Sequence, residues 1–401
     1  MDSETEKMTG MNPQKKPLVN PKIAEKLRDW RRYFEAKLGF RDHWYAALLS
    51  TDIAEGEVQT TTLLGEQLLL RRIDGKVFAM KDQCLHRGVP LSRKVETYTK
   101  DTITCWYHGW TYRWSDGLLC DILTDPGSKM IGTRSNKVYA VEEAKGLIFV
   151  FVGDIDPPPL ATDVPPNFLD ADRAAYGIRR LVKSNWRLGA ENGFDTTHIF
   201  IHKDSPFITG RDAAVPLGFA SAKQPNFRIF DDPQAARGVV DHMHEHYLPI
   251  FDATIAGESV FKLKAATGKH ATIHTVSLWM PGILSVENHP EYDTIQYEFY
   301  VPYDQDQHMY FQVLEKLDAP SQADADAFTA VCKSLHEPLA LRGFNDDDLW
   351  AREATQAFYQ DDWGWIDEQL MEQDKNLVVW RKLASQWGRS LQTLEHTEGH
   401  P

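Results

Sequence analysis

The pattern of hydrophobic and polar positions divides the chain into a helical start, two regions of short strands and a helical end. Near the start, Asn20 is a favoured helix N-cap residue and Pro21 suits the first helical position. An apolar stripe at helical spacing then runs as far as Gly39, and its members are Ile23, Leu27, Trp30, Phe34 and Leu38. The sequence therefore predicts an amphipathic helix behind a polar tail, and we assign residues 1–41 to this N-terminal segment.

Short alternating segments replace the helical pattern after the first 41 residues. Residues 68–73 and 76–81 flank Asp74-Gly75, a pair favoured in tight hairpin turns. A second turn of this kind is expected at Asp116-Gly117. Further strands are predicted over residues 102–105, 111–114 and 147–152. We therefore expect residues 42–157 to form a small all-β domain.

A proline-rich connector at residues 156–166 separates this region from the rest of the chain. Strand patterns return beyond it, at residues 259–264, 272–280, 283–287, 294–300 and 309–314. The end of the chain has apolar residues at helical spacing that are expected to face a core, namely Trp363, Ile366, Leu370, Leu377, Trp380, Ala384 and Trp387. Residues 158–401 are thus predicted to combine an antiparallel sheet with helices, which makes the whole chain α+β.

Composition narrows the classes of partner and compartment. The chain has 401 residues, enough for two domains, and 44 basic against 58 acidic side chains give a formal net charge of -14. This balance argues against nucleic acid or an anionic membrane as the main partner. No apolar run is long enough to span a membrane, the first residues are polar rather than signal-like, and only four cysteines occur. We therefore expect a soluble protein of the reducing cytoplasm.

The segment from Glu191 to His202 contains a candidate metal site. His198 and His202 are four residues apart, so on a helix both imidazoles can reach one metal ion, and Asp195 lies on the same face. Two interpretations are open. The three side chains form a polar helix face, or a carboxylate from far along the chain completes the two-histidine, one-carboxylate triad of a non-haem Fe(II) site.

A second candidate metal site lies inside the predicted β domain. Cys84 and His86 form a C-x-H motif, and Cys105 and His108 form a C-x2-H motif with eighteen residues between the two motifs. Each motif offers one thiolate and one imidazole, as in a Rieske [2Fe-2S] cluster with two cysteines on one iron and two histidines on the other. The alternative is a Cys2His2 zinc site, but a zinc finger pairs its cysteines and its histidines separately. The alternation therefore favours the Rieske cluster.

With both motifs present, the chain resembles the catalytic α-subunit of the Rieske non-haem iron aromatic-ring hydroxylating oxygenases, and within that family the carbazole-type enzymes. The resemblance extends from about Leu38 to Trp387 and is strongest in residues 38–45, 105–114, 185–188, 191–195 and 343–353. It implies a Rieske domain at residues 42–157 and a catalytic mononuclear iron domain at residues 158–401, whose antiparallel sheet is surrounded by helices in a helix-grip-like arrangement. It also implies a [2Fe-2S] cluster, a mononuclear Fe(II), O2 as cosubstrate and a homotrimer. The chain has no GxGxxG motif for a nicotinamide or flavin, so its electrons would come from a ferredoxin served by a separate NAD(P)H-dependent reductase.

The third iron ligand is implied by the family pattern, in which an aspartate is followed five positions later by a glutamate. Asp346, Asp347 and Asp348 are all available, and only Asp348 has Glu353 at this distance. We therefore assign Asp348 and keep Asp347 as the alternative. Without the resemblance, three consecutive aspartates would be interpreted as the start of a helix.

The resemblance also implies a role for Asp195. At this position the family has a bridge that links the Rieske histidine of one subunit to an iron histidine of the next, so that an electron can cross the interface. Here the linked histidines would be His108 and His198. The alternative is that Asp195 only supports His198 within its own subunit.

The implied activity is that of a terminal oxygenase that dihydroxylates an aromatic or heteroaromatic ring, with angular dioxygenation of carbazole as the specific expectation. The alternatives are a Rieske monooxygenase or demethylase of the same fold, or a non-catalytic Rieske electron carrier, which would need only about the first 160 residues. A flat apolar substrate with one N–H needs an apolar pocket and one acceptor. We predict that the pocket is lined by Asn192, Gly193, Ile199, Trp279, Ile283, Leu284 and Phe344, with the Gly193 carbonyl as the acceptor.

Overall fold

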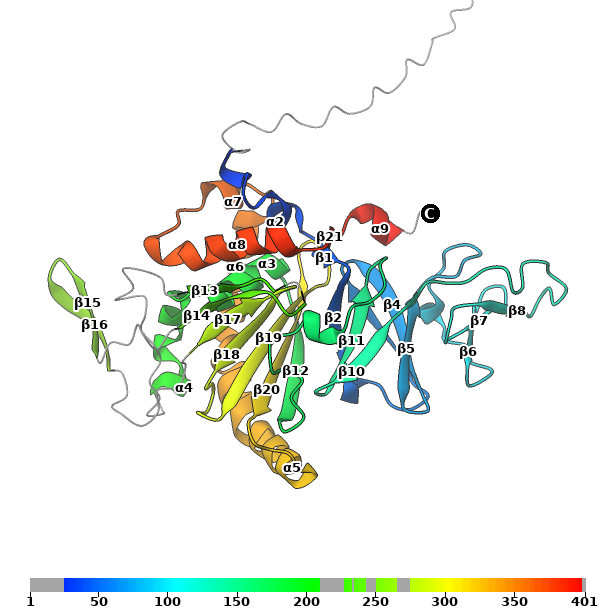
Figure 1. Cartoon of the computed structure of the whole chain (residues 1–401), viewed down its shortest axis with the longest axis horizontal. Helices are drawn as coiled ribbons and strands as arrows, with labels where there is room; N and C mark the ends of the chain where they lie inside the picture. The colour runs from blue at the N-terminus through cyan, green and yellow to red at the C-terminus, as the bar shows by residue number, and fades with distance from the viewer. Residues whose placement is uncertain (1–24, 210–226, 233, 243–249, 265–274, 399–401) are drawn as a thin grey trace, which may run out of the picture.

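The computed structural model describes residues 25–209, 227–232, 234–242, 250–264 and 275–398, and it contains two β bodies that lie side by side (Figure 1). The start of the expected N-terminal helix, at Asn20 and Pro21, lies outside the described residues. The described part of this helix is interrupted at Trp30, whose backbone is not helical, and it continues as α2 (Arg31–Glu35). Leu27 and Trp30 are buried, as the apolar stripe predicted.

Three small sheets form the first body, in the region predicted to be all-β. One sheet has the order β3 (Val58–Leu63), β4 (Glu66–Ile73), β5 (Lys76–Lys81) and β9 (Val138–Tyr139). The second has the order β10 (Val141–Ala144), β11 (Leu147–Val152) and β2 (His43–Leu49). The third has the order β6 (Thr102–Thr104), β7 (Trp110–Arg113) and β8 (Leu119–Ile122), at the outer end of the body (Figure 1).

Both predicted hairpin turns are confirmed. Asp74 and Gly75 join β4 to β5, and both residues have positive φ, 51° and 75°. This conformation is the one that a two-residue turn of the primed type requires. At the second turn, between β7 and β8, Gly117 has φ 71° and its Cα packs against the backbone of Asn136, so a side chain would not fit there.

A seven-stranded antiparallel sheet forms the second body. Its order is β12 (Ala174–Val182), β20 (His308–Lys316), β19 (Thr294–Pro302), β18 (Ile283–Glu287), β17 (Val276–Trp279), β14 (Gly238–Asp241) and β13 (Phe227–Phe230). The strand predicted at residues 259–264 exists as β16 (Glu258–Lys264), but it pairs with β15 (Ile250–Ile255) in a separate hairpin instead of joining the main sheet. The first residues of the strand predicted at 272–280 lie outside the described part, and β17 covers its end.

Helices cover one face of the large sheet, while the other face meets the first body (Figure 1). On the covered face, α3 (Trp186–Phe194) lies against β17 to β20, and α6 (Asn345–Tyr359) and α8 (Lys375–Trp387) pack on α3. The predicted C-terminal helix is divided, because α7 (Gly364–Asp367) precedes α8 as a separate turn. Trp380 is buried as expected, whereas Trp363 and Leu370 are 52% and 41% exposed and do not face the core.

Strand alternation places two different cores on the two faces of the large sheet. Leu278, Leu284 and Tyr300 belong to the core under α3 and α8. The neighbours of these three residues in the same strands face the other way, and they are Trp279, Ile283 and Phe299. They belong to a core that continues into the first body through Trp44 and Phe149. The two bodies are therefore joined by a shared hydrophobic core. None of the helices in the described part of the chain is long and apolar enough to cross a bilayer.

Candidate metal centres and substrate cavity

The predicted histidine pair lies in η4 (His198–Asp204), a short 3-10 helix rather than the α-helix expected from the spacing. The chain changes direction here because Asp195 ends α3 and its Oδ1 accepts hydrogen bonds from the backbone N–H and the hydroxyl of Thr197, both at 2.7 Å. The two imidazole rings nevertheless converge. Their centroids are 5.4 Å apart and their planes are 85° apart.

Each imidazole is oriented by a contact at Nδ1. The Nδ1–H of His198 donates to the Asp195 carbonyl, and Nδ1 of His202 lies 3.3 Å from Oδ2 of Asp347. Because both partners are oxygen acceptors, a neutral ring at either position would carry its proton at Nδ1 and leave a lone pair at Nε2 for a metal ion. This is the arrangement that holds metal-ligating histidines in place in proteins.

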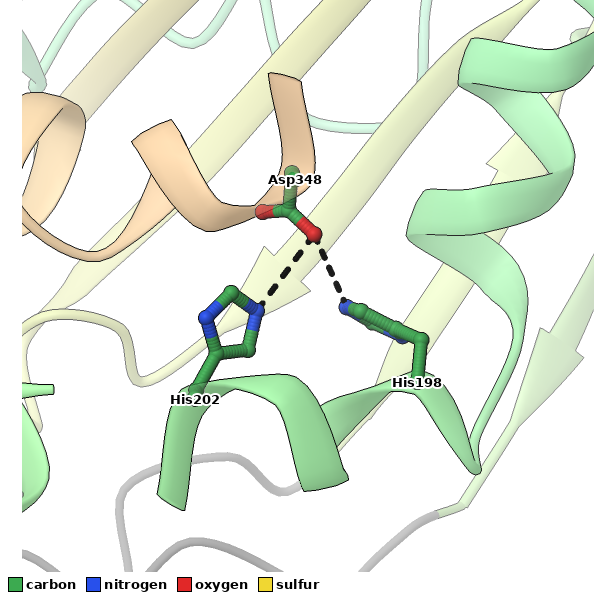
Figure 2. A group of neighbouring side chains, drawn as sticks. All are labelled: His198, His202 and Asp348. Carbon is green, nitrogen blue, oxygen red and sulfur yellow. Dashed lines mark ion pairs between the residues drawn. The ribbon is translucent and has the colours of Figure 1, made fainter. Parts of the chain in front are cut away.

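Asp348 completes the group from the first turn of α6 (Figure 2). Its Oδ1 lies 3.4 Å from Nε2 of both His198 and His202, and the three ligand atoms lie within 4.8 Å of one another. Asp348 Oδ1 and His202 Nε2 are buried without a hydrogen-bond partner among the described residues, which is unusual for polar atoms. Three lone-pair donors that converge without a hydrogen between them fit a bound cation, and the donor set suits Fe(II).

The charges around Asp348 favour its ionised form. Burial alone would raise its pKa, but in the metal-free protein the positive charge of a protonated His202 and of Arg352 holds the pKa of Asp348 well below its ordinary value. Its second oxygen, Oδ2, accepts a hydrogen bond of 2.9 Å from the Asn345 amide. The carboxylate is thus ionised and oriented before any metal binds.

The other two aspartates of the triplet have different partners. Asp347 contacts Nδ1 of His202, the ring nitrogen that does not face Asp348, and Asp346 forms an ion pair with Arg180 at the surface. Glu353 lies five positions after Asp348, and this spacing was the reason for assigning Asp348. It accepts a hydrogen bond of 3.1 Å from the backbone N–H of Lys183. Of the three candidates, only Asp348 faces both histidines.

The C-x-H motif and the C-x2-H motif lie in two equivalent loops, one after β5 and one between β6 and β7. Each loop closes with a glycine of φ 70°, because the Gly88 N–H donates to the Cys84 carbonyl and the Gly109 N–H to the Cys105 carbonyl. Both cysteines are buried. The histidines lie nearer the surface, with the Nδ1 atoms of His86 and His108 3.1 Å apart.

The arrangement of these four side chains favours the Rieske interpretation. The two buried cysteines lie on the inner side of the loops, and the two histidines face each other nearer the surface. One iron held by two thiolates and another held by two imidazoles would be arranged in this way.

A cavity adjoins the mononuclear site between α3, α6 and the large sheet. Four of the predicted pocket residues line it: Gly193, Ile199, Leu284 and Phe344. Phe344 also stacks on the His202 ring, with 3.8 Å between centroids. Several other residues that were not predicted from the sequence also line it, namely Val276, Val286, His289, Gln296, Glu298 and Asn345.

Three predicted pocket residues lie elsewhere. Trp279 and Ile283 are directly paired across β17 and β18, and both point to the opposite face of the sheet. Since neighbouring residues of a strand face opposite sides, Ile283 and Leu284 could not both line one cavity. Asn192 does not line this cavity either. Its side-chain Oδ1 accepts a hydrogen bond from Nε of Arg352 at 2.5 Å.

Comparison with known families decides what these sites belong to. The model of the Rieske [2Fe-2S] domain matches residues 43–131, and the model described as homotrimeric ring hydroxylase matches residues 151–392. The chain belongs to the Rieske ring-hydroxylating oxygenases. The family expected from the two motifs is therefore confirmed, and so are its α+β fold and its pairing of a Rieske cluster with a mononuclear iron.

Similarity to individual Rieske ring hydroxylases extends over almost the whole chain. The terminal oxygenase component of carbazole 1,9a-dioxygenase from Metapseudomonas resinovorans is 50% identical over 95% of this chain and 99% of that protein. The corresponding component from a Sphingomonas species is also 50% identical, over 93% and 98%. Among solved structures, the reduced oxygenase–ferredoxin complex of carbazole 1,9a-dioxygenase matches with a TM-score of 0.89 at 49% identity, covering 96% of this chain and 99% of that one. The terminal oxygenase from Novosphingobium sp. KA1 matches with a TM-score of 0.87 at 47% identity, over 92% and 99%.

The two metal sites of this Rieske oxygenase lie in different bodies of one chain. The loops next to β6 and β7 are at one end of the molecule, and α3 is in the other body (Figure 1). Asp195 supports His198 through its carbonyl within the same chain. Large apolar side chains are exposed near both sites, with Leu85, Tyr107, Leu123 and Met130 beside the cluster loops and Trp350, Trp363, Leu370 and Met371 on and after α6.

Proposed function

We propose that this chain is the terminal oxygenase of a multicomponent dioxygenase that acts on carbazole or a closely related tricyclic ring. The observation that carries this proposal is the 50% identity to carbazole oxygenases over nearly the full length of both chains. Similarity restricted to the Rieske domain would support only an electron carrier. Here it includes the sheet, α3 and α6, which surround the mononuclear site.

The ligand roles follow from the geometry of the two sites. Cys84 and Cys105 would hold one iron of the cluster, His86 and His108 the other, and His198, His202 and Asp348 the mononuclear Fe(II). When bound, the cluster carries single electrons and the Fe(II) provides the site at which O2 is activated. The chain supplies orientation, because Asp347 and the Asp195 carbonyl hold the two imidazoles and Asn345 holds the Asp348 carboxylate.

Electron transfer requires a second copy of the chain, and we propose the homotrimer named in the family description. The separation of the two sites in one chain and the exposed apolar groups beside each of them support this assembly. In it, the face formed by the cluster loops of one subunit would meet the α6 face of the next. Asp195 would then link His108 of one subunit to His198 of the other.

Regiochemistry is proposed to depend on the Gly193 carbonyl. Gly193 is in the last turn of α3, where carbonyls lack donors within the helix. The N–H that would continue the helix belongs to Thr197, and it donates to the Asp195 carboxylate instead. A carbazole N–H bound to the Gly193 carbonyl would turn the ring carbon next to nitrogen towards the iron, which gives angular attack and ring opening.

The glycine itself is required at this position by its surroundings. A Cβ on residue 193 would collide with the Tyr300 hydroxyl and lie 2.8 Å from Leu284 Cδ2. The backbone can therefore approach the cavity only because residue 193 has no side chain. A flat ring in the cavity would face this bare backbone on one side and Phe344 on another.

Product analysis tests the activity. Purified oxygenase, ferredoxin and reductase should convert carbazole, and mass spectrometry with labelled O2 should find both oxygen atoms of one molecule in the product. Incorporation of a single oxygen atom would instead identify a monooxygenase. A protein that reduces and reoxidises its cluster without any product would be an electron carrier.

Ligand affinity tests the acceptor. Carbazole should bind more tightly than fluorene, which lacks the N–H, by about 1 kcal/mol, or about fivefold in dissociation constant. Equal binding, with fluorene attacked at the same angular position, would remove the Gly193 carbonyl from the mechanism.

The remaining assignments concern partners, location and domain boundaries. The ferredoxin bound to the similar oxygenase in its solved complex supports a ferredoxin donor, which a separate NAD(P)H-dependent reductase would reduce. The small number of cysteines, with Cys84, Cys105, Cys120 and Cys332 all unpaired, is consistent with a cytoplasmic location. We propose boundaries after residues 41 and 157; the family match that begins at residue 43 supports the first, whereas the second match already begins at residue 151.

A further inference from the structure

Arg352 is a buried cation that lies between two cavities. It is on α6, one turn beyond Asp348, and its side chain is 0% exposed. Arg352 and Asp195 both line the cavity at the mononuclear site, and both also line a second cavity on the far side, towards Leu377 and Arg381 of α8. Arg352 is therefore part of the wall between the proposed substrate site and the region where Asp195 would meet a neighbouring subunit.

The guanidinium is fixed by several contacts to different elements. Its Nε donates to Oδ1 of Asn192 at 2.5 Å, and its Nη2 lies 3.5 Å from Oε2 of Glu298 and 3.4 Å from the Tyr300 hydroxyl. It also lies over the rings of Tyr300 and Tyr310, with 5.1 and 4.7 Å to the centroids. A planar, permanently charged group with donors in a fixed fork suits this position better than a flexible ammonium.

These contacts hold the end of α3 from two sides. Arg352 holds Asn192 through its side-chain oxygen. The next residue, Gly193, packs against the Tyr300 hydroxyl, which itself donates to Glu298, the partner of Arg352. Two residues further on, Asp195 ends the helix and orients His198.

We propose that Arg352 is a positioning residue that fixes the Asn192–Gly193 segment, and thereby places both the Gly193 carbonyl in the substrate cavity and the Asp195 turn beside the iron ligands. This inference rests on the proposed function, because it assigns to Arg352 the placement of the acceptor proposed there. One buried cation would then link recognition of the substrate N–H to the path by which the electron arrives.

The test measures how well the holoenzyme distinguishes carbazole from fluorene, by anaerobic binding titration. Wild-type protein should prefer carbazole by about fivefold or more. Arg352→Lys keeps the positive charge but loses the planar guanidinium, and it should reduce the preference of the iron-loaded fraction to less than about twofold while the cluster spectrum stays unchanged. Asn192→Ala removes the same contact from its other end and should give the same loss.

A double variant and a matched control complete the design. If both substitutions act through one contact, Arg352→Lys combined with Asn192→Ala should lose no more preference than either alone. Arg381→Lys is the control, since Arg381 is also buried, binds Glu191 of α3 at 2.9 and 2.6 Å and, of these two cavities, lines the second but not the substrate cavity. It should lower the melting temperature and leave the carbazole preference intact.

The outcomes separate this inference from the proposed function. Equal binding of carbazole and fluorene to wild-type protein would overturn the Gly193 acceptor and the positioning role together. A wild-type preference that survives in both Arg352→Lys and Asn192→Ala would overturn only the positioning role. If Arg352→Lys does not accumulate as folded holoenzyme, Asn192→Ala decides, because it leaves the buried cation in place.

Discussion

At the scale of single residues, the mononuclear site shows how neighbouring carboxylates take different roles. Asp348 directs Oδ1 at the two Nε2 atoms, while Asp347, one position earlier on the same helix, contacts the outer nitrogen of His202. Successive residues of a helix point about 100° apart, so only one of the pair can face the metal. The assignment of Asp348 came from the family spacing to Glu353, because three consecutive aspartates give no indication of which one is turned inward.

This geometry predicts different results for two adjacent substitutions. Asp348→Ala should abolish retention of mononuclear iron and all turnover, because two imidazoles alone hold Fe(II) poorly. Asp347→Ala should weaken iron binding by roughly 10- to 100-fold through loss of His202 orientation, and it should leave a measurable occupied fraction. Metal analysis after dialysis gives iron per chain, and an unchanged cluster spectrum serves as the control for folding. Loss of the iron from Asp347→Ala but not from Asp348→Ala would reverse the assignment.

Beside the Rieske loops, Tyr112 of strand β7 has a role that follows from its hydrogen bonds. The Tyr112 hydroxyl accepts a hydrogen bond of 3.0 Å from the Leu85 N–H, so its own hydrogen is available to Cys84 Sγ at 3.3 Å. A donor to a ligand sulfur stabilises the reduced, more negative cluster and raises its reduction potential. A hydrogen bond of about 1 kcal/mol corresponds to roughly 40 mV for one electron.

Tyr112→Phe should therefore lower the cluster potential by an amount on the order of 40 mV. The ring remains to fill the core, so the cluster should still assemble. A redox titration followed by EPR or circular dichroism measures the shift, and Tyr107→Phe, at an exposed residue of the loop that precedes β7, is the matched control. An equal or higher potential in Tyr112→Phe would show that the hydroxyl does not donate to the sulfur.

At the scale of elements, prediction from the sequence succeeded where local geometry has one solution. The Asp74-Gly75 turn needs two residues of positive φ, and the run Leu147–Val152 is a fully buried strand, so both were expected in their observed places. Strand β12 was missed because Gly177 and the pair Arg179-Arg180 interrupt its apolar alternation, and its stability comes from pairing with β20 along its whole length. Tertiary pairing of this kind leaves little trace in the local pattern.

The same limit explains the misplaced pocket residues. Ile283 and Leu284 are both apolar and adjacent in the sequence, but only the register of β17 and β18 decides which face each one occupies. Leu284→Ala should enlarge the substrate cavity and weaken carbazole binding. Ile283→Ala should leave carbazole affinity unchanged and lower the free energy of unfolding by about 2–5 kcal/mol, because it opens a hole in the core shared by the two bodies. Ligand titration and denaturant unfolding of both variants provide the comparison, and equal effects on affinity would contradict the observed register.

At the scale of the whole molecule, one chain contains both metal sites but not the path between them. The cluster loops and the end of α3 belong to different bodies (Figure 1), and the described contacts of the Asp195 carboxylate are to Thr197 of its own chain. The motifs in the sequence could reveal both sites, because their ligands are close together in the chain apart from Asp348. They could not reveal how the sites communicate, because that depends on an interface between folded copies.

Transfer between subunits makes a specific prediction for mixed trimers. A chain with His108→Ala lacks a functional cluster, and a chain with Asp348→Ala lacks the mononuclear iron, so trimers of either variant alone should be inactive. Co-expressed with different affinity tags and purified through both, mixed trimers should recover activity, because an intact cluster in one subunit then faces an intact iron site in the next. Adding Asp195→Ala to the His108→Ala chain, which supplies the iron site, should abolish that recovery while iron per trimer stays constant. Adding Asp195→Ala to the Asp348→Ala chain is the matched control and should leave the recovery intact, since that chain contributes only its cluster. Mixed trimers without activity would exclude transfer between subunits, and recovery that survives Asp195→Ala in the iron-bearing chain would confine Asp195 to the support of His198.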